Sequence, residues 1–369
     1  MYAASRTLPN GRRDNEARSS ESITESGRRR HAEGALLGLA VGDALGTTNE
    51  FADLDAPPFP TLATGPHASM AGGGPFRVAP GQVTDDTQMA TALWASLVAT
   101  GGFDLKDVAR RYVAWTKYAF DIGHQTGAAL RLVARGTSPS ESGRKVWESR
   151  GRQPAANGSL MRTAPIAVFF AADAKGRRAA SLGDSAITHF DPRCQLACAS
   201  FDAAIAQCCI GAPDVPAIFD VARAEIDAAA RSLGNESAAG SSVQDAREAL
   251  HADLVAAEAN DPELYGATLH LHGHAGFVRV AFRLAFWELA HAPTFEAALV
   301  DAVNRGGDAD TNGAITGALL GAYHGRDAIP REWIDAVLSA LQGKDGPLAT
   351  TYHPRVLLAS TATREDAAN

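Results

Sequence analysis

The chain has 369 residues, 46% of them hydrophobic, which is enough to bury one large core or two smaller ones. Its formal net charge of −8, from 34 basic and 42 acidic side chains, argues against general nucleic-acid binding, which needs a basic surface. No apolar run reaches the roughly 20 residues of a membrane helix, and the N-terminus lacks the apolar stretch of a secretory signal. We therefore expect neither nucleic acid nor a membrane as a partner.

The first 30 or so residues differ in composition from the rest of the chain. They are rich in Arg, Ser, Glu, Asn and Gly, and they contain too few aliphatic residues to build a core. Seven arginines outnumber four acidic residues there, so the segment is locally basic. Two interpretations stay open, a disordered terminus and an arm that orders on a partner. The predicted organisation is a basic tail at 1–30, a folded domain at 31–345 and a C-terminal extension at 346–369.

The first segment of the predicted domain has a glycine at every fourth position. Gly34, Gly38, Gly42 and Gly46 would lie along one face of a helix and let a second helix pack closely against it. The segment superficially matches a dinucleotide-binding fingerprint, but no strand precedes it. The spacing therefore predicts a close contact between helices.

Helical spacing dominates the remaining chain. Apolar residues recur three and four apart at 87–99, 105–118, 193–210, 277–289 and 294–303. Start signals agree, because Ser138 opens a motif like a capping box and Thr294 precedes Phe-Glu. No run alternates with the two-residue period of a half-buried strand. The predicted fold class is all-α, a single compact domain of many helices.

Four cysteines fall within or at the end of one predicted helix, 193–210. They are Cys194, Cys198, Cys208 and Cys209. In a chain of this length they predict reduced thiols in a cytoplasmic protein rather than a disulfide framework. A soft-metal site is the alternative to small buried core residues.

Residues 84–87 read Thr-Asp-Asp-Thr and stand at the start of the predicted helix 87–99. Asp is favoured in the first turn of a helix, so the motif alone fits a helix cap as well as a metal site. Residues 306–311 read Gly-Gly-Asp-Ala-Asp-Thr, where the two glycines permit a tight approach of the backbone. Glycine-rich loops lead into this second cluster and into the first, and such loops commonly line a site.

The two clusters together predict a two-metal centre. Four carboxylates brought together would repel one another unless cations neutralised them. Oxygen ligands of this kind suit Mg²⁺ or Mn²⁺ rather than zinc. A pair of such ions is typical of a hydrolase that clamps neighbouring oxygens of its substrate.

These motifs, in this order, resemble the ADP-ribosylglycohydrolase family, whose members include enzymes that remove ADP-ribose from arginine. The resemblance covers about residues 33–340 and rests on the motifs at 42–46, 50–51, 73–77, 80–87, 120–123, 157–162, 188–192 and 304–311. It implies the family's all-α fold and a pair of Mg²⁺ or Mn²⁺ ions.

The resemblance also assigns residues to the site. Six positions match the family's metal ligands: Thr84, Asp85, Asp86, Asp308, Asp310 and Thr311. Two carboxylates, Glu50 and Asp121, match acidic residues at the site and become candidate catalytic acids or bases. Without the resemblance, Glu50 would be interpreted as solvated surface.

The substrate side follows from the same positions. The turn Asn157, Gly158 and Ser159 matches a substrate loop, whose amides at the start of a helical stretch at 160–170 could hold a diphosphate. The other matching substrate-binding positions are Gly123, His124, His189 and Phe277. His124 and Phe277 replace the Asn and Tyr common among relatives, which bears on substrate preference.

The resulting hypothesis is metal-dependent hydrolysis of the N-glycosidic bond between ADP-ribose and a protein side chain, most readily arginine. Its partner would be an ADP-ribosylated protein. The alternative is an immunity or binding protein that neutralises an ADP-ribosyltransferase toxin, in part through the basic tail. A catalytically silent relative is disfavoured, because all six metal-ligand positions are intact.

Overall fold

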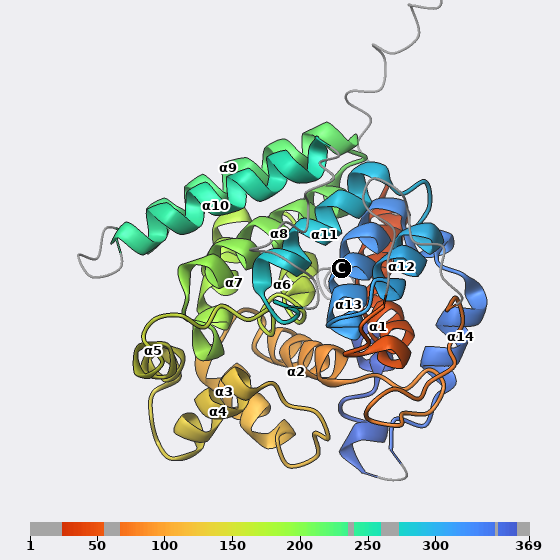
Figure 1. Cartoon of the computed structure of the whole chain (residues 1–369), viewed down its shortest axis with the longest axis horizontal. Helices are drawn as coiled ribbons and strands as arrows, with labels where there is room; N and C mark the ends of the chain where they lie inside the picture. The colour runs from red at the N-terminus through yellow and green to blue at the C-terminus, as the bar shows by residue number, and fades with distance from the viewer. Residues whose placement is uncertain (1–23, 55–66, 235–239, 260–272, 344–345, 360–369) are drawn as a thin grey trace, which may run out of the picture.

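The computed structural model describes residues 24–54, 67–234, 240–259, 273–343 and 346–359 (Figure 1). Within these ranges the chain is helical without a named strand, and its only strand-like pairings are isolated bridges, Gly73 with Val78 and Ala156 with Phe277. The predicted all-α fold is confirmed. The helices are α1 (Glu25–Gly46), α2 (Asp85–Thr100), α3 (Leu105–Trp115), α4 (His124–Ala134), α5 (Pro139–Ser149), α6 (Ala164–Phe169), α7 (Ala174–Thr188), α8 (Pro192–Ile210), α9 (Val215–Leu233), α10 (Gly240–Glu258), α11 (Val278–His291), α12 (Phe295–Asn304), α13 (Ala309–His324) and α14 (Arg331–Ser339), with short 3₁₀ turns η1 (Thr47–Asn49), η2 (Arg326–Ala328), η3 (Pro347–Ala349) and η4 (Pro354–Leu358).

The five stretches with helical spacing all fall on helices, namely α2, α3, α8, α11 and α12, with ends shifted by a few residues. Thr294 caps α12 as predicted, since its hydroxyl accepts a hydrogen bond from the Ala297 amide at 3.1 Å. The capping box at Ser138 is wrong. Ser138 precedes α5, but its hydroxyl pairs with that of Ser140 at 2.9 Å and accepts no bond from the helix backbone.

The folded domain extends beyond both predicted boundaries. Thr24 caps α1 by accepting a bond from the Gly27 amide at 3.2 Å, so the three arginines at 28–30 belong to this helix rather than to the tail. Glu33, one turn after Arg29, forms an ion pair with it at 2.8 Å. At the other end, η4 returns to the core and buries Leu357. The tail residues 1–23 lie outside the described residues.

The central contact of the fold joins α1 and α13, which lie side by side in Figure 1. Glycines meet in pairs along this contact: Gly34 with Gly321, Gly38 with Gly317, and Gly42 with Gly313. A Cβ atom added to Gly38 would lie 2.0 Å from the carbonyl oxygen of Gly317, so the two backbones touch directly. The close helix contact predicted for the glycine face of α1 is confirmed. The facing helix, α13, carries glycines at the same four-residue spacing.

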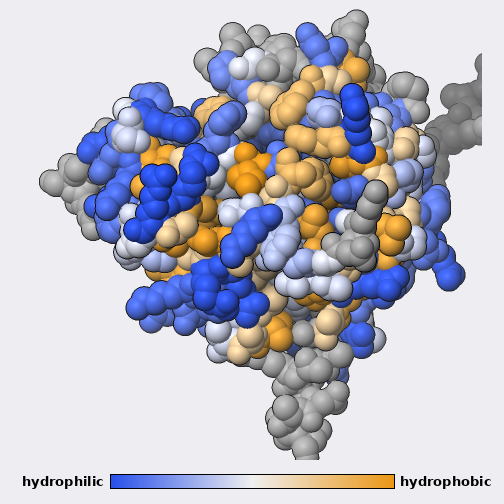
Figure 2. Space-filling model, turned by 90° about the horizontal axis from the view of Figure 1, so that it is seen from below, coloured by the Kyte–Doolittle hydropathy of each residue, from blue (hydrophilic) through white to orange (hydrophobic). Residues whose placement is uncertain are grey.

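The other helices enclose this pair. Long helices α9 and α10 run antiparallel along one edge, next to α8 and α11, while α2 lies beside the lower end of α1 in the view of Figure 1. On the face seen in Figure 2, hydrophobic residues emerge between hydrophilic ones. No helix in the described ranges combines the length and apolar character needed to cross a membrane.

Gly38→Ala tests the contact between α1 and α13. Helix propensity alone would favour Ala by about 1 kcal/mol, but the new methyl group would strike a backbone carbonyl that cannot rotate away. We expect a net loss of about 2 kcal/mol or more in the free energy of unfolding, measured by urea denaturation. Gly102→Ala is the matched control, because a Cβ atom there meets nothing within 4 Å. A G38A variant as stable as wild type would contradict the described packing.

Candidate metal centre and substrate cleft

The α1–α13 contact places a buried carboxylate, Asp43, beside the start of α2. Asp43 accepts hydrogen bonds from the amides of Thr84 at 3.0 Å and Thr87 at 3.1 Å, and from both threonine hydroxyls. It thereby fixes the N-terminal turn of α2, which carries Asp85 and Asp86. Asp43 is not among the predicted site residues. The feature that could have identified it is its charge, because the rest of residues 34–46 are small or apolar.

The described residues contain two groups of carboxylates close enough to share a cation. Oxygens of Asp43, Asp86 and Asp310 lie within 4.8 Å of one another, and so do oxygens of Glu50, Asp308 and Asp310. The structure thus brings together the two acidic clusters, more than 200 residues apart in the chain, with Asp310 common to both groups.

The potential ligand atoms of both carboxylate groups suit hard divalent cations. All of them are carboxylate oxygens, and oxygen is the ligand atom that Mg²⁺ and Mn²⁺ prefer. The Thr84 hydroxyl lies 3.0 Å from an oxygen of Asp86 and 3.3 Å from one of Asp310. One oxygen of Asp86, Oδ1, is buried and has no hydrogen-bond partner within the described chain. A buried, unpaired carboxylate oxygen is costly, and a cation would satisfy it.

Burial raises the pKa of these carboxyl groups. It brings the pKa of Asp308 to about 6 and, with the charge of Asp308 added, that of Asp310 to about 7. The pKa of Asp86 is raised well above its usual value by burial, and then by the charge of Asp310. Without a cation the cluster therefore holds protons near neutral pH, and a bound cation would release them.

Glu50 is buried within the second carboxylate group rather than on the surface. Its Oε2 accepts a bond from the Asp310 amide at 3.3 Å, and burial followed by the charge of Asp310 raises its pKa. Asp85 and Asp121 line the same cleft as Glu50 but belong to neither carboxylate group. Burial raises the pKa of Asp121 to about 6, with the charge of Asp308 adding to it.

Two loops are joined beside Glu50. The Phe51 amide donates to Gly307 O at 2.6 Å, and the Gly307 amide donates to Ala52 O at 2.9 Å. Gly306 and Gly307 have φ values of 71° and 68°, and a Cβ atom on Gly306 would lie 2.3 Å from Ala52 O. The two glycines before the second acidic cluster thus permit the tight backbone approach expected of them.

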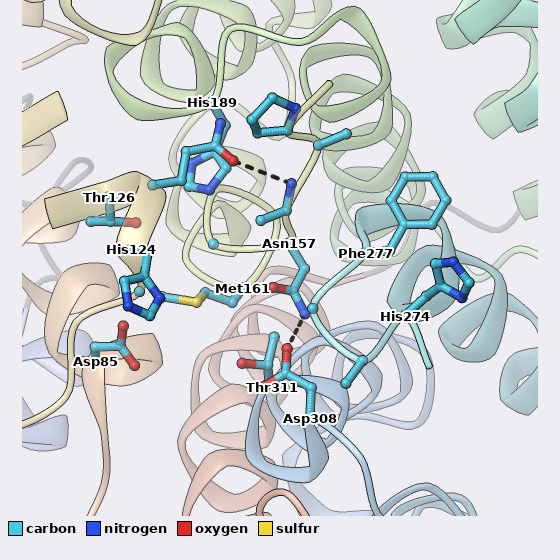
Figure 3. A pocket seen from close by; sticks show the side chains of 18 of the residues that line it. Asp85, His124, Thr126, Asn157, Met161, His189, His274, Phe277, Asp308 and Thr311 are labelled. Carbon is cyan, nitrogen blue, oxygen red and sulfur yellow. Dashed lines mark hydrogen bonds between the residues drawn. The ribbon is translucent and has the colours of Figure 1, made fainter. Parts of the chain in front are cut away.

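The substrate loop reaches the carboxylates through Asn157. Its Nδ2 donates to Asp308 Oδ2 at 2.6 Å, drawn as a dashed line in Figure 3. Gly158 packs on the ring of His189, since a Cβ atom there would lie 2.9 Å from His189 Cε1. The Ser159 side chain does not line the cleft. Its hydroxyl instead accepts a bond from the Ser185 hydroxyl of α7 at 3.0 Å.

The predicted placement of this turn at a helix start is wrong. Helix α6 begins at Ala164, and residues 158–162 form turns, so the amides of Gly158 and Ser159 are not at a helix N-terminus. Pro165 at the second position of α6 suits the first turn of a helix and marks its start.

Arg162 orders the substrate loop from behind. It is fully buried and forms an ion pair with Asp184 at 3.0 Å, while its Nη1 donates to Gly158 O at 2.9 Å. Its Nη2 donates to the Thr188 hydroxyl, which in turn pairs with His189 Nδ1 at 2.8 Å. Burial, and then the charge of Arg162, holds the pKa of His189 well below its usual value, so the imidazole is neutral. A role for Arg162 is not visible in the sequence, because its partner Asp184 lies 22 residues further on, in α7.

A cleft of about 900 Å³ connects these parts. Figure 3 shows Asp85 and His124 on one side of the view, Asp308 and Thr311 near its centre, and Phe277 on the other side. Of the predicted site residues, twelve line the cleft: Glu50, Asp85, Asp121, Gly123, His124, Asn157, Gly158, His189, Phe277, Asp308, Asp310 and Thr311. The other three do not line it: Thr84, Asp86 and Ser159 are buried.

The four cysteines are free and buried in α8, as predicted. Burial raises the pKa of the Cys198 thiol to about 12. The candidate ligand groups in the described part of the chain consist of carboxylates alone, so the alternative of a soft-metal cysteine site has no support there.

A helical fold with two groups of buried carboxylates beside a cleft defines the class of site, a candidate cation centre next to a candidate substrate cleft. The family model for ADP-ribosylglycohydrolase matches residues 24–360, and the chain belongs to this family of enzymes, which hydrolyse the N-glycosidic bond to ADP-ribose.

Individual relatives agree with the family match. The chain is 31% identical to the ADP-ribosylarginine hydrolase Tri1 of Pseudomonas putida over 322 residues, 83% of this chain and 74% of that protein. It is also 31% identical to the ADP-ribosyl-[dinitrogen reductase] glycohydrolase of Rhodospirillum rubrum over 307 residues, 82% of this chain and 88% of the relative. A solved structure titled an ADP-ribosylglycohydrolase-related protein complex matches with a TM-score of 0.62 and 29% identity, covering 90% of this chain and 98% of that chain.

The raised carboxyl pKa values predict that, without cations, the free energy of unfolding falls as the pH rises through neutrality. Asp308 and Asp310 bind protons more tightly in the folded chain than in the unfolded chain, where Asp has a pKa near 3.9. Their stabilising contribution is complete below that value and is lost as pH rises through about 6 to 7. We expect the Tm in chelator to fall between pH 5.5 and 8, measured by calorimetry.

Mg²⁺ or Mn²⁺ should raise the Tm more at pH 8 than at pH 5.5, because the ligands are then ionised. At a cation concentration 100 times its Kd, binding would add about 2.7 kcal/mol to the free energy of unfolding. Asp310→Asn should flatten the pH dependence in chelator and remove the gain from the cation. An equal gain at both pH values would count against a site built from these carboxylates.

Proposed function

We propose that this enzyme removes ADP-ribose from arginine side chains of modified proteins, using two divalent cations, Mg²⁺ or Mn²⁺. The observation that carries the proposal is the pair of carboxylate groups sharing Asp310. The link to arginine is supported by the relative named an ADP-ribosylarginine hydrolase. A partner that is itself a modified protein is supported by the relative named for dinitrogen reductase.

Bound cations would hold the ribose hydroxyls and stabilise the charge that develops as the glycosidic bond breaks. Asp43, Asp86, Asp308 and Asp310 would hold them. The Thr84 hydroxyl lies within 3.3 Å of oxygens of Asp43, Asp86 and Asp310, and it can donate its hydrogen to one of them and offer its oxygen to a cation. Asn157 orients Asp308 by donating a hydrogen bond to its Oδ2 at 2.6 Å. Asp85 and Thr311, which line the cleft, would complete the ligand set.

Asp121 is our candidate for the general acid or base. Its pKa of about 6 suits proton transfer near neutral pH, and it borders the cleft outside both carboxylate groups. Glu50 lies within hydrogen-bond reach of the Asp310 amide and belongs to a carboxylate group. This supports a role for Glu50 in binding a cation or in orienting Asp310.

The far end of the cleft would receive the ADP part of the substrate. His189 supplies a neutral ring packed on Gly158. Phe277 supplies an aromatic face without a hydroxyl, and the guanidinium of Arg193 lies 5.4 Å from its ring centroid. Gly123 and His124 open α4 on the side of the cleft that carries Asp121.

The alternative, an immunity or binding protein that neutralises a toxin, would act in part through the basic tail at 1–30, of which residues 1–23 lie outside the described residues. Neither of the two relatives named above is described by its name as binding a toxin.

Alanine at Asp85 or Asp308 should lower turnover by on the order of 10²-fold or more, since each removes a charge that the cations need. The assay is release of ADP-ribose from arginine-modified and serine-modified peptides, with Mg²⁺, with Mn²⁺ and with chelator. Asp220→Ala is the control, because this carboxylate is 79% exposed and pairs only with Arg223 in the described chain. Full activity of D85A or D308A in chelator would end the two-cation proposal.

Asp121→Asn should lower kcat and remove the limb of the pH–rate profile centred near pH 6. Cation affinity, measured by calorimetric titration with Mn²⁺, should change little. An unchanged acidic limb would assign proton transfer to another group.

A further inference from the structure

Phe51 stands out among the residues that line the cleft. Its side chain is 64% exposed, although it is large and apolar. Its backbone has a φ of 56°, in the left-handed region that few residues other than glycine adopt. It lines the cleft directly after Glu50. An aromatic residue that is both strained and exposed at a site calls for an explanation.

The backbone conformation is fixed from both sides. The Phe51 amide donates to Gly307 O at 2.6 Å, and the Ala52 amide donates to Asn49 O at 2.9 Å. Relaxing φ would break the bond that holds Gly307 immediately before Asp308. The fold therefore needs a left-handed residue at position 51, but it does not need a phenylalanine, because glycine or asparagine would adopt this conformation at lower cost.

The ring is not used in the core. Phe51 is not part of the buried hydrophobic cluster, and it forms no aromatic pair within the described residues. Neither packing nor backbone geometry thus accounts for the aromatic side chain. What remains is the cleft that it faces.

The chemistry around Phe51 favours a planar cation. Phe51 directly follows Glu50 of the second carboxylate group, and its amide is bonded to Gly307 O, next to Asp308. Asp85 and Asp121 line the same cleft, and a group of carboxylates attracts a positive charge. A guanidinium is planar and weakly hydrated, and it stacks on an aromatic face. In the proposed reaction the bound cations would hold the ribose, so the arginine joined to its anomeric carbon would lie close to these carboxylates and to Phe51.

We propose that the Phe51 ring stacks on the guanidinium of ADP-ribosylated arginine and sets the preference of this enzyme for an arginine leaving group. The inference rests on the proposed function of the same cleft. The left-handed backbone at Phe51 and its bond to Gly307 would keep the residue beside the second carboxylate group. Phe51 is thus a specificity-determining residue for the side chain that carries ADP-ribose.

Two kinds of variant separate the ring from the backbone. Phe51→Asn and Phe51→Gly keep the left-handed conformation and remove the ring, whereas Phe51→Tyr keeps the ring. We expect F51N and F51G to lower kcat/KM for an arginine-modified peptide about tenfold, within the range of a cation–π contact, and F51Y to stay within about threefold of wild type. Thermal unfolding of each variant verifies that it folds.

Free ADP-ribose supplies the second measurement, because it lacks the guanidinium. Its Kd for the Mg²⁺-loaded enzyme should stay within about twofold in all three variants, by calorimetric titration. Full activity of F51N and F51G on the arginine peptide would overturn the inference. So would an equal loss of ADP-ribose affinity in these variants, or a folded F51Y variant as impaired as F51N.

Failure of the proposed function would look different. Wild type would then release no ADP-ribose from the arginine peptide, and the binding measurement alone would decide the role of Phe51. Weaker binding of the arginine-modified peptide to F51N, with ADP-ribose binding unchanged, would support the inference even without turnover. Equal binding of the peptide by wild type and F51N would refute it.

Discussion

The direct contact between the backbones of α1 and α13 is the constraint on which the site depends. Glycine in a helix lowers its stability, because the free chain loses more conformational freedom. Here three glycine pairs let the helix axes approach until carbonyl oxygens of one helix fill the space that a Cβ atom would occupy on the other. Asp43 follows one of these glycines, and Asp310 precedes another by one turn. The contact therefore determines the separation between the two carboxylates.

The buried carboxylates near the site are neutralised in two different ways. Behind the substrate loop, Asp184 is neutralised by Arg162, and behind the second acidic cluster Asp301 is paired with the buried Arg305 at 2.7 Å. At the centre itself no described basic residue pairs with Asp86 or Asp310. Natural sequences place unfavourable electrostatics where function needs them and stabilise the surroundings instead. The buried arginine pairs hold rigid the loops that carry Asn157 and Asp308.

Much of the fold could be predicted from the sequence, because helical periodicity and the glycine face are local patterns. The two acidic clusters could be located for the same reason. Asp43 could not be assigned, since only the contact with α13 brings it near Asp310. The direction of Ser159 depends on its contact with Ser185 of α7, which is not visible in local spacing. The late start of α6 had a local signal in Pro165, which the helical spacing alone does not weigh. The start of α1 depended on a threonine cap inside a segment whose composition indicated a tail.

Two cysteines of α8, Cys194 and Cys198, can serve as chemical probes of whether the substrate loop stays packed on this helix. Cys198 lies 3.5 Å from the Ser159 hydroxyl, and the Cys194 thiol donates to Ala156 O at 3.3 Å, so both lie against the substrate loop. Burial keeps these thiols protonated and out of reach of reagents. Alkylation would then require the loop to leave α8, and its rate would measure how often that happens. Ligand that closes the loop would slow the labelling, without any probe attached to the chain.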